Sequence, residues 1–406
     1  MAGSRRSRQF EVASDIDHTR GRHALRAGAV VNGEQVRSDQ RTDYLGTYTF
    51  AGLAAYRAGT PATYTQQIGD PRLGYWIATA GFYLQDDLRL GKSVVLSPGL
   101  RYELQTHLRD RDALAPRLGA TWAPFESGRT TVRGSLGLFS GWLDAGTYEE
   151  TVRTAGSRLR QVAIADPAYP VRAETGSTVP AMRYLLGDTL SLERTARVSA
   201  GLAQLLAPRT RLNVLYNGTR ASRLFRGRDR NAPVRGLRPD AAEAGVVEVL
   251  SDARATSHRL LTTISQNLSR GGASTGQALV DWRRTRLTAS YTWSSTRNNT
   301  DGPFGIPATG DLSREWGPAP GDRRHVLLAL LSTQAIRNVS ALLTWSASSA
   351  RPYNVTTGFD DNGDTIFNDR PVGVGRNSRR AAPQRSLEGT FLPGCILTAR
   401  AAVRAM

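Results

Sequence analysis

The chain has 406 residues, with 53 lysines and arginines against 35 aspartates and glutamates, which gives a formal net charge of +18. Only 40% of its residues are hydrophobic and no apolar run approaches about 18 residues, so no transmembrane helix is expected. A single cysteine, Cys395, excludes an internal disulfide. The basic residues are arginines apart from Lys92, and they are spread along the chain, which suits an anionic partner such as nucleic acid, lipid phosphate or lipopolysaccharide.

The first residues, MAGSRRSRQFEV, contain basic side chains but no apolar segment behind them. They do not form a signal peptide. We therefore expect either a cytoplasmic protein or a chain whose true N-terminus lies upstream.

Apolar and polar residues alternate strictly in several stretches, which indicates strands with one apolar and one polar face. The clearest stretch is VVLSPGLRYELQTHL at 94–108, and the pattern recurs near 210–218, 286–295 and 338–348. It predicts twelve strands, at about 9–18, 23–36, 72–89, 93–108, 114–124, 130–142, 192–206, 210–219, 256–269, 280–295, 323–333 and 339–350. Short helices are expected only at 144–153 and 188–197. Several strands exceed the usual soluble length of about 5–6 residues and reach the 9–11 that a tilted membrane strand needs.

Short turns and long polar loops alternate along the chain. The turns lie at 20–23, 90–93, 124–129, 207–210 and 334–338, and the loops at 37–71, 143–191, 220–255, 296–322 and 351–380. Only the short link at 109–113 and the long turn near 270–279 break the order. Outer-membrane β-barrels sort their connections in this way, with short turns in the periplasm and long loops outside.

Aromatic residues lie near both kinds of connection, as two interfacial girdles require. Trp122 and Phe125 flank a short turn, whereas Trp142, Trp293, Trp345 and Tyr353 lie near long loops. The alternative is that these rings fill a β core. Arg101, Arg133 and Arg211 fall on the polar side of their strands, where they would line a barrel interior, meet a plug or attract an anionic ligand; a solvated face is the simpler interpretation.

An acidic stretch, YNVTTGFDDNGDTIFNDRP at 353–371, interrupts the basic chain. Asp360, Asn362 and Asp364 have the 1, 3, 5 spacing of a calcium loop, but the glycine falls at position 4 and Pro371 takes position 12. The stretch is better explained as a turn.

In that turn, Asn362 and Gly363 make the reversal, and TGFD and DTIF form the two arms. Asp361 and Asp364 would be a candidate acid–base pair, but they lack the apolar surroundings that separate two pKa values.

The five histidines show no metal-binding spacing: they are His18, His23, His107, His258 and His325. His18 and His23 flank a turn and are expected to be solvated. No nucleophile or phosphate-binding motif is present. We therefore predict no enzyme activity, no catalytic or metal site and no cofactor, and we assign no ligand-binding residue.

Phrases in order along about 9–380 resemble TonB-dependent receptors of the Oar-like subgroup, which are large outer-membrane barrels. They include FYLQDDLRL (82–90), LSPGLRYELQ (96–105), LAPRLGATWAPF (114–125), GDRRHVLLALL (321–331) and SARPYNVTTGFDDNGDTIFNDRP (349–371). Family members also carry a signal peptide, a plug domain and about 22 strands. The resemblance therefore implies a partial antiparallel transmembrane β-barrel over 1–380, with about twelve strands and long extracellular loops, in an all-β fold.

The last residues, FLPGCILTARAAVRAM, lack the terminal aromatic of the family, so 381–406 is expected to be an atypical tail, frameshifted or disordered. The resemblance implies uptake of a scarce ligand in the outer membrane, with lipid and lipopolysaccharide around the barrel. The TonB complex would act through the plug, and no nucleic-acid partner is expected. The alternative is a secreted basic β-sandwich, a binding protein or adhesin for anionic glycans. Twelve strands would close only if the strand of Phe10 met the strand at 339–350, and the chain alone is expected not to transport.

Overall fold

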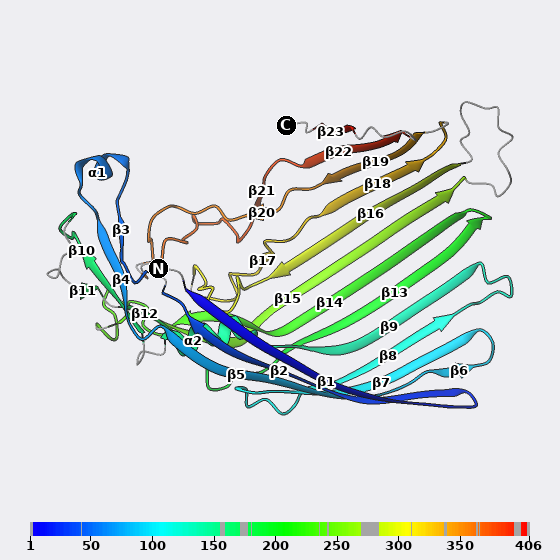
Figure 1. Cartoon of the computed structure of the whole chain (residues 1–406), viewed down its shortest axis with the longest axis horizontal. Coiled ribbons are helices and arrows are strands. Elements are labelled where there is room, and N and C mark those ends of the chain that lie inside the picture. The colour runs from blue at the N-terminus through cyan, green and yellow to red at the C-terminus, as the bar shows by residue number, and fades with distance from the viewer. Residues whose placement is uncertain are drawn as a thin grey trace.

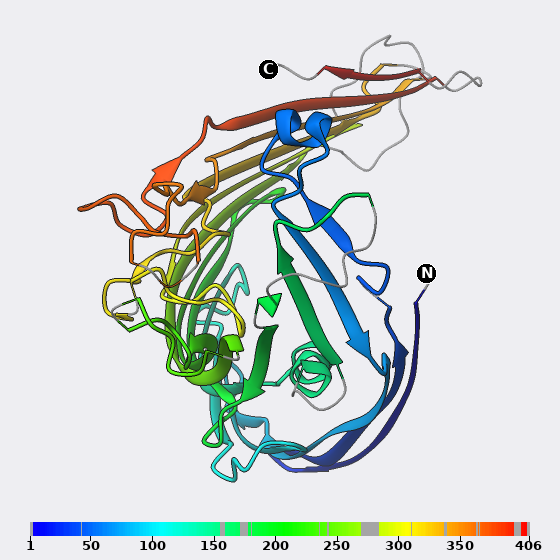
Figure 2. The same cartoon turned by 90° about the vertical axis from the view of Figure 1, so that its left-hand side faces the viewer.

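A curved sheet of long antiparallel strands forms most of the molecule (Figures 1 and 2). The computed structural model describes residues 3–41, 43–154, 159–170, 178–179, 181–234, 236–241, 243–268, 284–309, 311–336, 339–362, 364, 366–393 and 399–403. Within these residues the main sheet has 17 strands.

The main sheet is a meander in which each long strand pairs with the next in the chain. Its order is β1 (Ser4–Arg20), β2 (His23–Asp39), β5 (Arg72–Asp86), β7 (Val94–Gln105), β8 (Leu114–Trp122), β9 (Thr130–Gly141), β13 (Glu193–Ala207), β14 (Thr210–Asp229), β15 (Glu243–Asn267), β16 (Thr285–Asn298), β18 (His325–Thr333), β19 (Val339–Ser348), β22 (Gln384–Pro393) and β23 (Ala399–Val403). Short β6 (Leu88–Leu90) pairs with β7, and β17 (Gly317–Pro318) pairs with β16. β12 (Ala181–Leu186) runs parallel to the start of β15.

The alternation of the sequence becomes two faces of this sheet. Leu136 lies opposite Leu118 and Val198, whereas its neighbour Ser135 lies opposite Gly119 and Ser199. Leu136 is 59% exposed. The apolar side chains thus point outward from the curve, and the polar ones point into it. An outward apolar surface of this extent requires an apolar environment.

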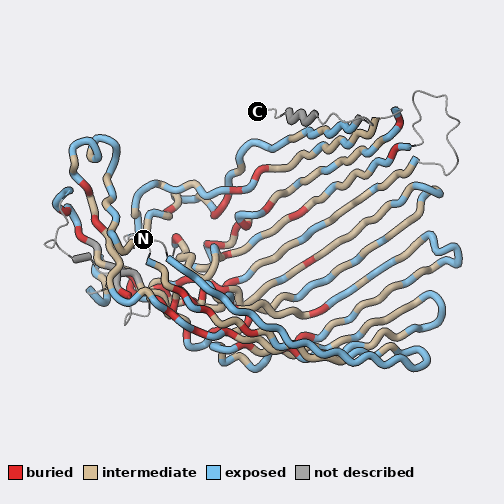
Figure 3. The backbone as a smooth tube through the Cα atoms, in the orientation of Figure 1, coloured by how far each residue is buried: buried red, intermediate tan, exposed pale blue. Residues whose placement is uncertain are grey.

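Most buried residues gather at the end of the sheet that carries the long loops, while the strands beyond it are mostly exposed or half-buried (Figure 3). Two small clusters form the core there. Val36, Leu73, Tyr75 and Ile77 make the first, and Leu143, Leu190, Phe225 and Val249 make the second.

The loops at that end carry further structure. A four-stranded sheet joins two of them: β3 (Thr47–Thr49), β4 (Thr63–Gly69), β10 (Leu159–Ala165) and β11 (Thr178–Val179). β20 (Pro352–Tyr353) pairs with β21 (Arg379–Arg380). Two short helices complete the fold, α1 (Leu53–Ala58) and α2 (Ala145–Thr154), and α2 lies inside the curve of the main sheet (Figure 2). In the described parts of the chain, no helix is long and apolar enough to cross a membrane.

All twelve predicted strands are present, and the helix predicted at 144–153 is α2. The helix predicted at 188–197 is wrong, because Glu193–Arg197 begin β13 and pair with β9. The loop predicted at 220–255 is also wrong over most of its length, since β14 and β15 continue to Asp229 and from Glu243. The turn near 270–279 lies outside the described residues.

The edges of the sheet differ from the closed arrangement considered above. Where the chain is described, β1 pairs only with β2, and β19 pairs with β18 and β22 rather than with β1. The sheet is therefore open between β1 and β23. β22 continues the meander beyond residue 380, inside the segment expected as an atypical tail. Since one curved sheet with an outward apolar face replaces two sheets packed on a common core, the β-sandwich alternative is wrong.

Candidate ligand-binding site

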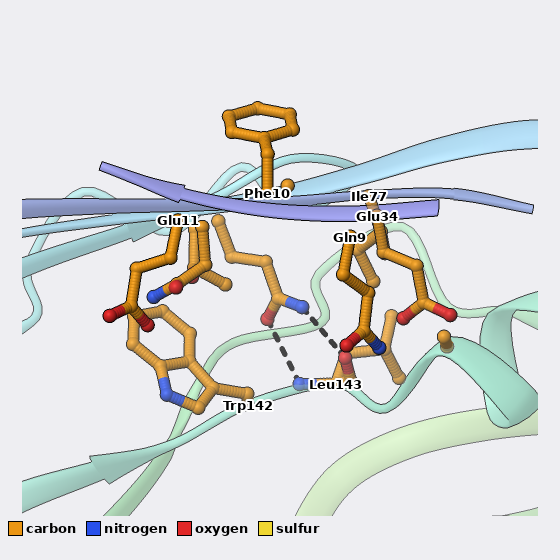
Figure 4. Close-up of a pocket in the computed structure, with 12 residues that line it drawn as sticks. Gln9, Phe10, Glu11, Glu34, Ile77, Trp142 and Leu143 are labelled. Carbon is orange, nitrogen blue, oxygen red and sulfur yellow. Dashed lines mark hydrogen bonds between the residues drawn. The ribbon is translucent and has the colours of Figure 1, made fainter. Parts of the chain in front are cut away.

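A cavity of about 510 Å³ lies on the concave face near the long-loop end. Its wall comes from the first four long strands, and its other side from the segment just before α2. The polar lining residues are Gln9, Glu11, Asn32, Glu34, Thr79 and Gln105. Trp142 and Leu143 face them across the cavity, while the ring of Phe10 points away, out of the sheet (Figure 4).

Gln105 fixes the distance between the two sides of the cavity. Its Nε2 donates to the carbonyl of Leu143 at 2.7 Å, and the amide of Leu143 donates back to its Oε1 at 2.9 Å (Figure 4). Both residues are buried, with Leu143 only 1% exposed. A buried amide with both ends satisfied holds one geometry, because losing either bond leaves an unpaired polar group.

α2 is anchored to the inner wall by its first residues. The Oδ1 of Asp144 accepts from the amide of Thr147 at 2.9 Å, which caps the helix. Tyr75 from β5 donates its hydroxyl to the carbonyl of Ala145 at 2.9 Å. Tyr148 stacks on His107, with ring centroids 3.9 Å apart. The helix is therefore a fixed part of the concave surface.

A buried ion-pair cluster holds the rest of α2. Glu149 pairs with Arg153 on the helix and, at 3.1 Å, with the Nε of Arg5 on β1. Arg153 also donates to the Oγ of Ser38 at 3.0 Å. Burial raises the pKa of Glu149, but hydrogen bonds from Ser38, Arg5 and Arg153 outweigh it, so this pKa lies below its usual value. Glu149 thus stays ionised and links the helix to two strands.

The cavity itself carries negative charge. Glu34 accepts from the hydroxyl of Ser7 at 2.7 Å and lies 3.7 Å from Arg5. Glu11 is exposed, and no partner for it is found among the described residues. Beside these carboxylates, the amides of Gln9 and Asn32 both donate and accept hydrogen bonds. A few convergent polar groups opposite an aromatic ring are typical of a small-molecule site.

Deeper along the concave face, arginines alternate with aromatic rings. Arg101 pairs with Glu103 at 2.6 Å and lies 6.0 Å from the ring of Tyr83. The guanidinium groups of Arg117 and Arg197 lie 4.3 and 4.6 Å from the ring of Phe139. These cation–π contacts hold the arginines on the inner wall. We call Arg101, Arg117 and Arg197 the arginine stripe.

The three arginines predicted from the sequence to face inward do so. Arg101 belongs to the stripe and lines a second cavity of about 210 Å³. Arg133 and Arg211 lie nearer the short turns on the same face and are exposed. The stripe's other members, Arg117 and Arg197, were not singled out, although the same alternation identifies them.

The acidic stretch at 353–371 is packed against another loop. The Oδ2 of Asp369 accepts from the amide of Asp361 at 2.8 Å, and Asp360 accepts from the amide of Asp364 at 3.0 Å. Asn362 donates to the carbonyl of Ala308 at 2.9 Å. Burial raises the pKa of Asp364. These carboxylates mainly satisfy backbone amides, as in a chain of turns.

The predicted hairpin arms of this stretch are wrong, since the described residues of TGFD and DTIF form no strand pair. Instead, the amide of Thr357 donates to the carbonyl of Asp369 at 2.9 Å. The reversal assigned to Asn362 and Gly363 includes Gly363, which lies outside the described residues. No group of three or more histidine, cysteine or carboxylate residues fit to hold a metal ion occurs in the described ranges.

The remaining residues considered above are dispersed. His23 is hydrogen-bonded to Asp86 at 2.6 Å, and His258 and His325 each bond a tyrosine, Tyr216 and Tyr291, at 2.8 Å. Trp142 is not part of a girdle, because it lines the cavity. Trp122 and Phe125 are exposed near a short turn, as expected. Cys395 lies outside the described residues.

A family described as outer membrane beta barrel domain matches residues 2–114 and 108–399, nearly the whole chain. The chain belongs to this family. Its apolar outward face is therefore the lipid-facing surface of an outer-membrane β-barrel, and its long loops lie at the outer face. A search of curated proteins found no match.

Solved structures share the barrel fold at low sequence identity. The outer membrane transporter YddB from Escherichia coli aligns with a TM-score of 0.66 and 11% identity, over 96% of this chain and 48% of that one. A ferric enterobactin receptor (PfeA) mutant from Pseudomonas aeruginosa gives 0.58 and 14%, over 95% and 46%. The FrpB iron transporter from Neisseria meningitidis gives 0.53 and 14%, over 96% and 49%. The chain spans about half the length of each of these proteins.

Proposed function

We propose that the chain forms part of the barrel wall and the outer loops of a TonB-dependent receptor, of the Oar-like subgroup, that takes up a ligand across the outer membrane. The observation that carries this proposal is the concave face. It carries polar side chains along most of the strands, and near the outer end it holds a 510 Å³ cavity whose far side is fixed by the bond between Leu143 and Gln105. A lumen with a preformed site below the outer loops is what a ligand-specific importer requires.

The lining of the cavity supports a neutral or cationic ligand rich in hydroxyl or amide groups, such as a glycan or a peptide. Glu11 and Glu34 would repel a carboxylate or phosphate at the first contact. Amides and carboxylates suit hydroxyl groups, and Trp142 offers a flat apolar surface.

An iron chelate is the second candidate. PfeA is a ferric enterobactin receptor and FrpB is an iron transporter, and the arginine stripe would attract an anionic chelate deeper in the lumen. A plug domain in the lumen would supply gating, and the TonB complex that acts through the plug would supply energy.

The proposed function is tested by uptake in cells. Accumulation of a labelled oligosaccharide, a peptide and a ferric chelate would be compared in cells with the gene, without it, and with the inner-membrane coupling complex disabled. We expect one class to accumulate only when the gene and the complex are both present. If cells without the gene accumulate each of the three ligand classes as well as cells with the gene do, the proposal is overturned.

The cavity is tested by substitutions that leave the wall intact. Trp142→Ala and Glu11→Gln should each weaken uptake of the accumulated ligand at limiting concentration, because both residues line the cavity. Ser135→Ala, also on the concave face but far along the sheet, should have no effect. If Ser135→Ala and Trp142→Ala behave alike, the binding site lies elsewhere.

A further inference from the structure

Three arginines lie together on the outward face of the barrel at its long-loop end. Arg6 and Arg8 share a face of β1 with Phe10, because side chains two residues apart in a strand point the same way. Phe10 points outward (Figure 4). Arg37 on β2 lies directly opposite Arg6 in the register. All three are exposed.

These arginines have no partner in the described part of the chain, unlike their inward-facing neighbours. Arg5 pairs with Glu149, and Ser7 donates to Glu34, both on the concave side. Arg6, Arg8 and Arg37 make no hydrogen bond or ion pair with any described residue. Like charges directly opposite each other in a sheet repel, so an external anion between Arg6 and Arg37 would stabilise the pair.

The position of the arginines along β1 matches the edge of a membrane. Between Arg8 and Arg20 the outward face carries Phe10, Val12, Ser14, Ile16 and His18. Twelve residues at a rise of about 3.3 Å, tilted by about 45°, cover roughly 28 Å of depth, close to the apolar band of about 25 Å around such barrels.

Arg6, Arg8 and Arg37 therefore lie at the level of the lipid headgroups on the outer side, directly above Phe10 and Trp76, whose ring centroids are 6.0 Å apart. We propose that these three residues bind the phosphate groups of a lipid in the outer leaflet, the phosphorylated glycolipid of this membrane. Guanidinium groups bind phosphate oxygens in bidentate fashion, and the rings below would contact the first part of the acyl chains.

The neighbouring acidic residues define the upper limit of this site. Asp39, two residues beyond Arg37, is engaged by Arg41 at 3.0 Å, and Asp70 is engaged by Arg72 at 3.0 Å. Directly below the site, the outward face of β1 carries the apolar or small side chains of Phe10, Val12, Ser14 and Ile16. An additional strand at the open edge would pair with the backbone of β1 and leave its outward side chains exposed. The site is independent of the transported ligand, since it lies on the other face of the wall from the cavity.

The test uses the full-length chain in detergent micelles, titrated with diphosphorylated lipid A and with the same lipid after removal of its phosphates. The triple variant R6Q/R8Q/R37Q should bind diphosphorylated lipid A at least about tenfold more weakly than the parent chain, because each basic residue near an anionic lipid surface contributes separately. Arg20→Gln, on the same strand and face but at the opposite edge of the apolar band, is the matched control and should bind like the parent.

R6K/R8K/R37K keeps the charge but loses the bidentate geometry, and it should fall between the two. If the triple glutamine variant does not fold, as judged by its strand circular dichroism, R8Q alone should still show a measurable loss. Equal binding of the dephosphorylated lipid, or equal binding by the parent and the triple variant, would overturn the proposal. So would full competition by inorganic phosphate or by a short DNA duplex at equal phosphate concentration, because either would show unselective anion binding.

Discussion

The buried ion pair between Glu315 and Arg370 should determine whether two outer loops behave as one unit. We call residues 299–324 and 349–383 the outer lobe. Arg370 donates to both carboxylate oxygens of Glu315 at 2.8 Å, and the side chains are only 5% and 4% exposed. Thr309 donates its amide at 3.1 Å and its hydroxyl at 2.8 Å to the same carboxylate. Glu315→Ala would remove the acceptor for all of these donors.

The cost follows from the burial of Arg370. Removing one partner of a buried pair typically costs about 3–5 kcal/mol, because the other charge is left without compensation. Since 1.36 kcal/mol corresponds to a factor of ten, local opening of the lobe should become roughly 10²- to 10⁴-fold more frequent. Replacing both residues by methionine should cost much less, because no charge then remains buried.

Amide hydrogen exchange of peptides from the outer lobe measures this opening. Glu315→Ala should speed exchange in both loops, including the amides of Thr357 and Asp361, whose acceptors lie on Asp369. Arg314→Ala is the matched control, because its pair with Asp311 is 3.6 Å long and exposed and should contribute little. Unchanged protection in Glu315→Ala, or exchange in the double methionine variant as fast as in the single alanine variant, would show that this ion pair does not hold the two loops together.

Three further outcomes are expected. Burial opposes ionisation of Glu315, but hydrogen bonds from Arg370 and Thr309 hold its pKa below the usual value. The stabilisation of the outer lobe by the ionised Glu315 should therefore be complete above about pH 4.3 and be lost as the pH falls through the lowered pKa. Protection from exchange that weakens when the pH is raised from 5 to 8 would contradict this. Leu136→Arg on the lipid face should lower the free energy of unfolding in a bilayer by about 2–4 kcal/mol, whereas Ser135→Arg on the inner face should change it little; urea unfolding in vesicles compares them. Leu143→Ala should destabilise the packing of α2 by about 2–5 kcal/mol, seen as faster exchange of α2 amides, and normal protection there would count against the buried position of Leu143.

The strands of the wall were predictable because each carries its own evidence. A strand with one lipid face and one polar face alternates regardless of its neighbours, so the stretch at 94–108 identifies β7 without knowledge of β5 or β8. The same alternation places Arg101 on the inner face. The sorting of short and long connections then gives the direction of the chain relative to the membrane.

The extensions of β14 and β15 were missed for a physical reason. Beyond the membrane one face of this ribbon is buried, with Phe225, Val247 and Val249 each at most 5% exposed, while cross-strand ion pairs link the two strands on the other face. Arg226 pairs with Asp252, and Arg228 pairs with Glu248, both at 2.6 Å. The charged composition of 220–255 therefore resembled a loop.

The cavity was not predictable either, because its two sides come from distant parts of the chain. Gln105 and Leu143 meet only once β7 and the segment before α2 are folded. Trp142 was assigned to a girdle because it follows a strand near a long loop, and nothing local shows that the chain turns inward there. The pairing of β4 with β10 likewise joins two separate loops.

In a barrel wall of this kind, lipid contacts the convex face of the sheet, and the concave face lines a polar lumen. Quenching by brominated lipids, in vesicles that contain the chain, distinguishes the two faces. Cys395 would be replaced by serine, and a fluorophore placed on Leu136→Cys or on Ser135→Cys, two adjacent residues of β9. We expect strong quenching at position 136 and little at position 135. Equal quenching at both positions, or none at either, would contradict it.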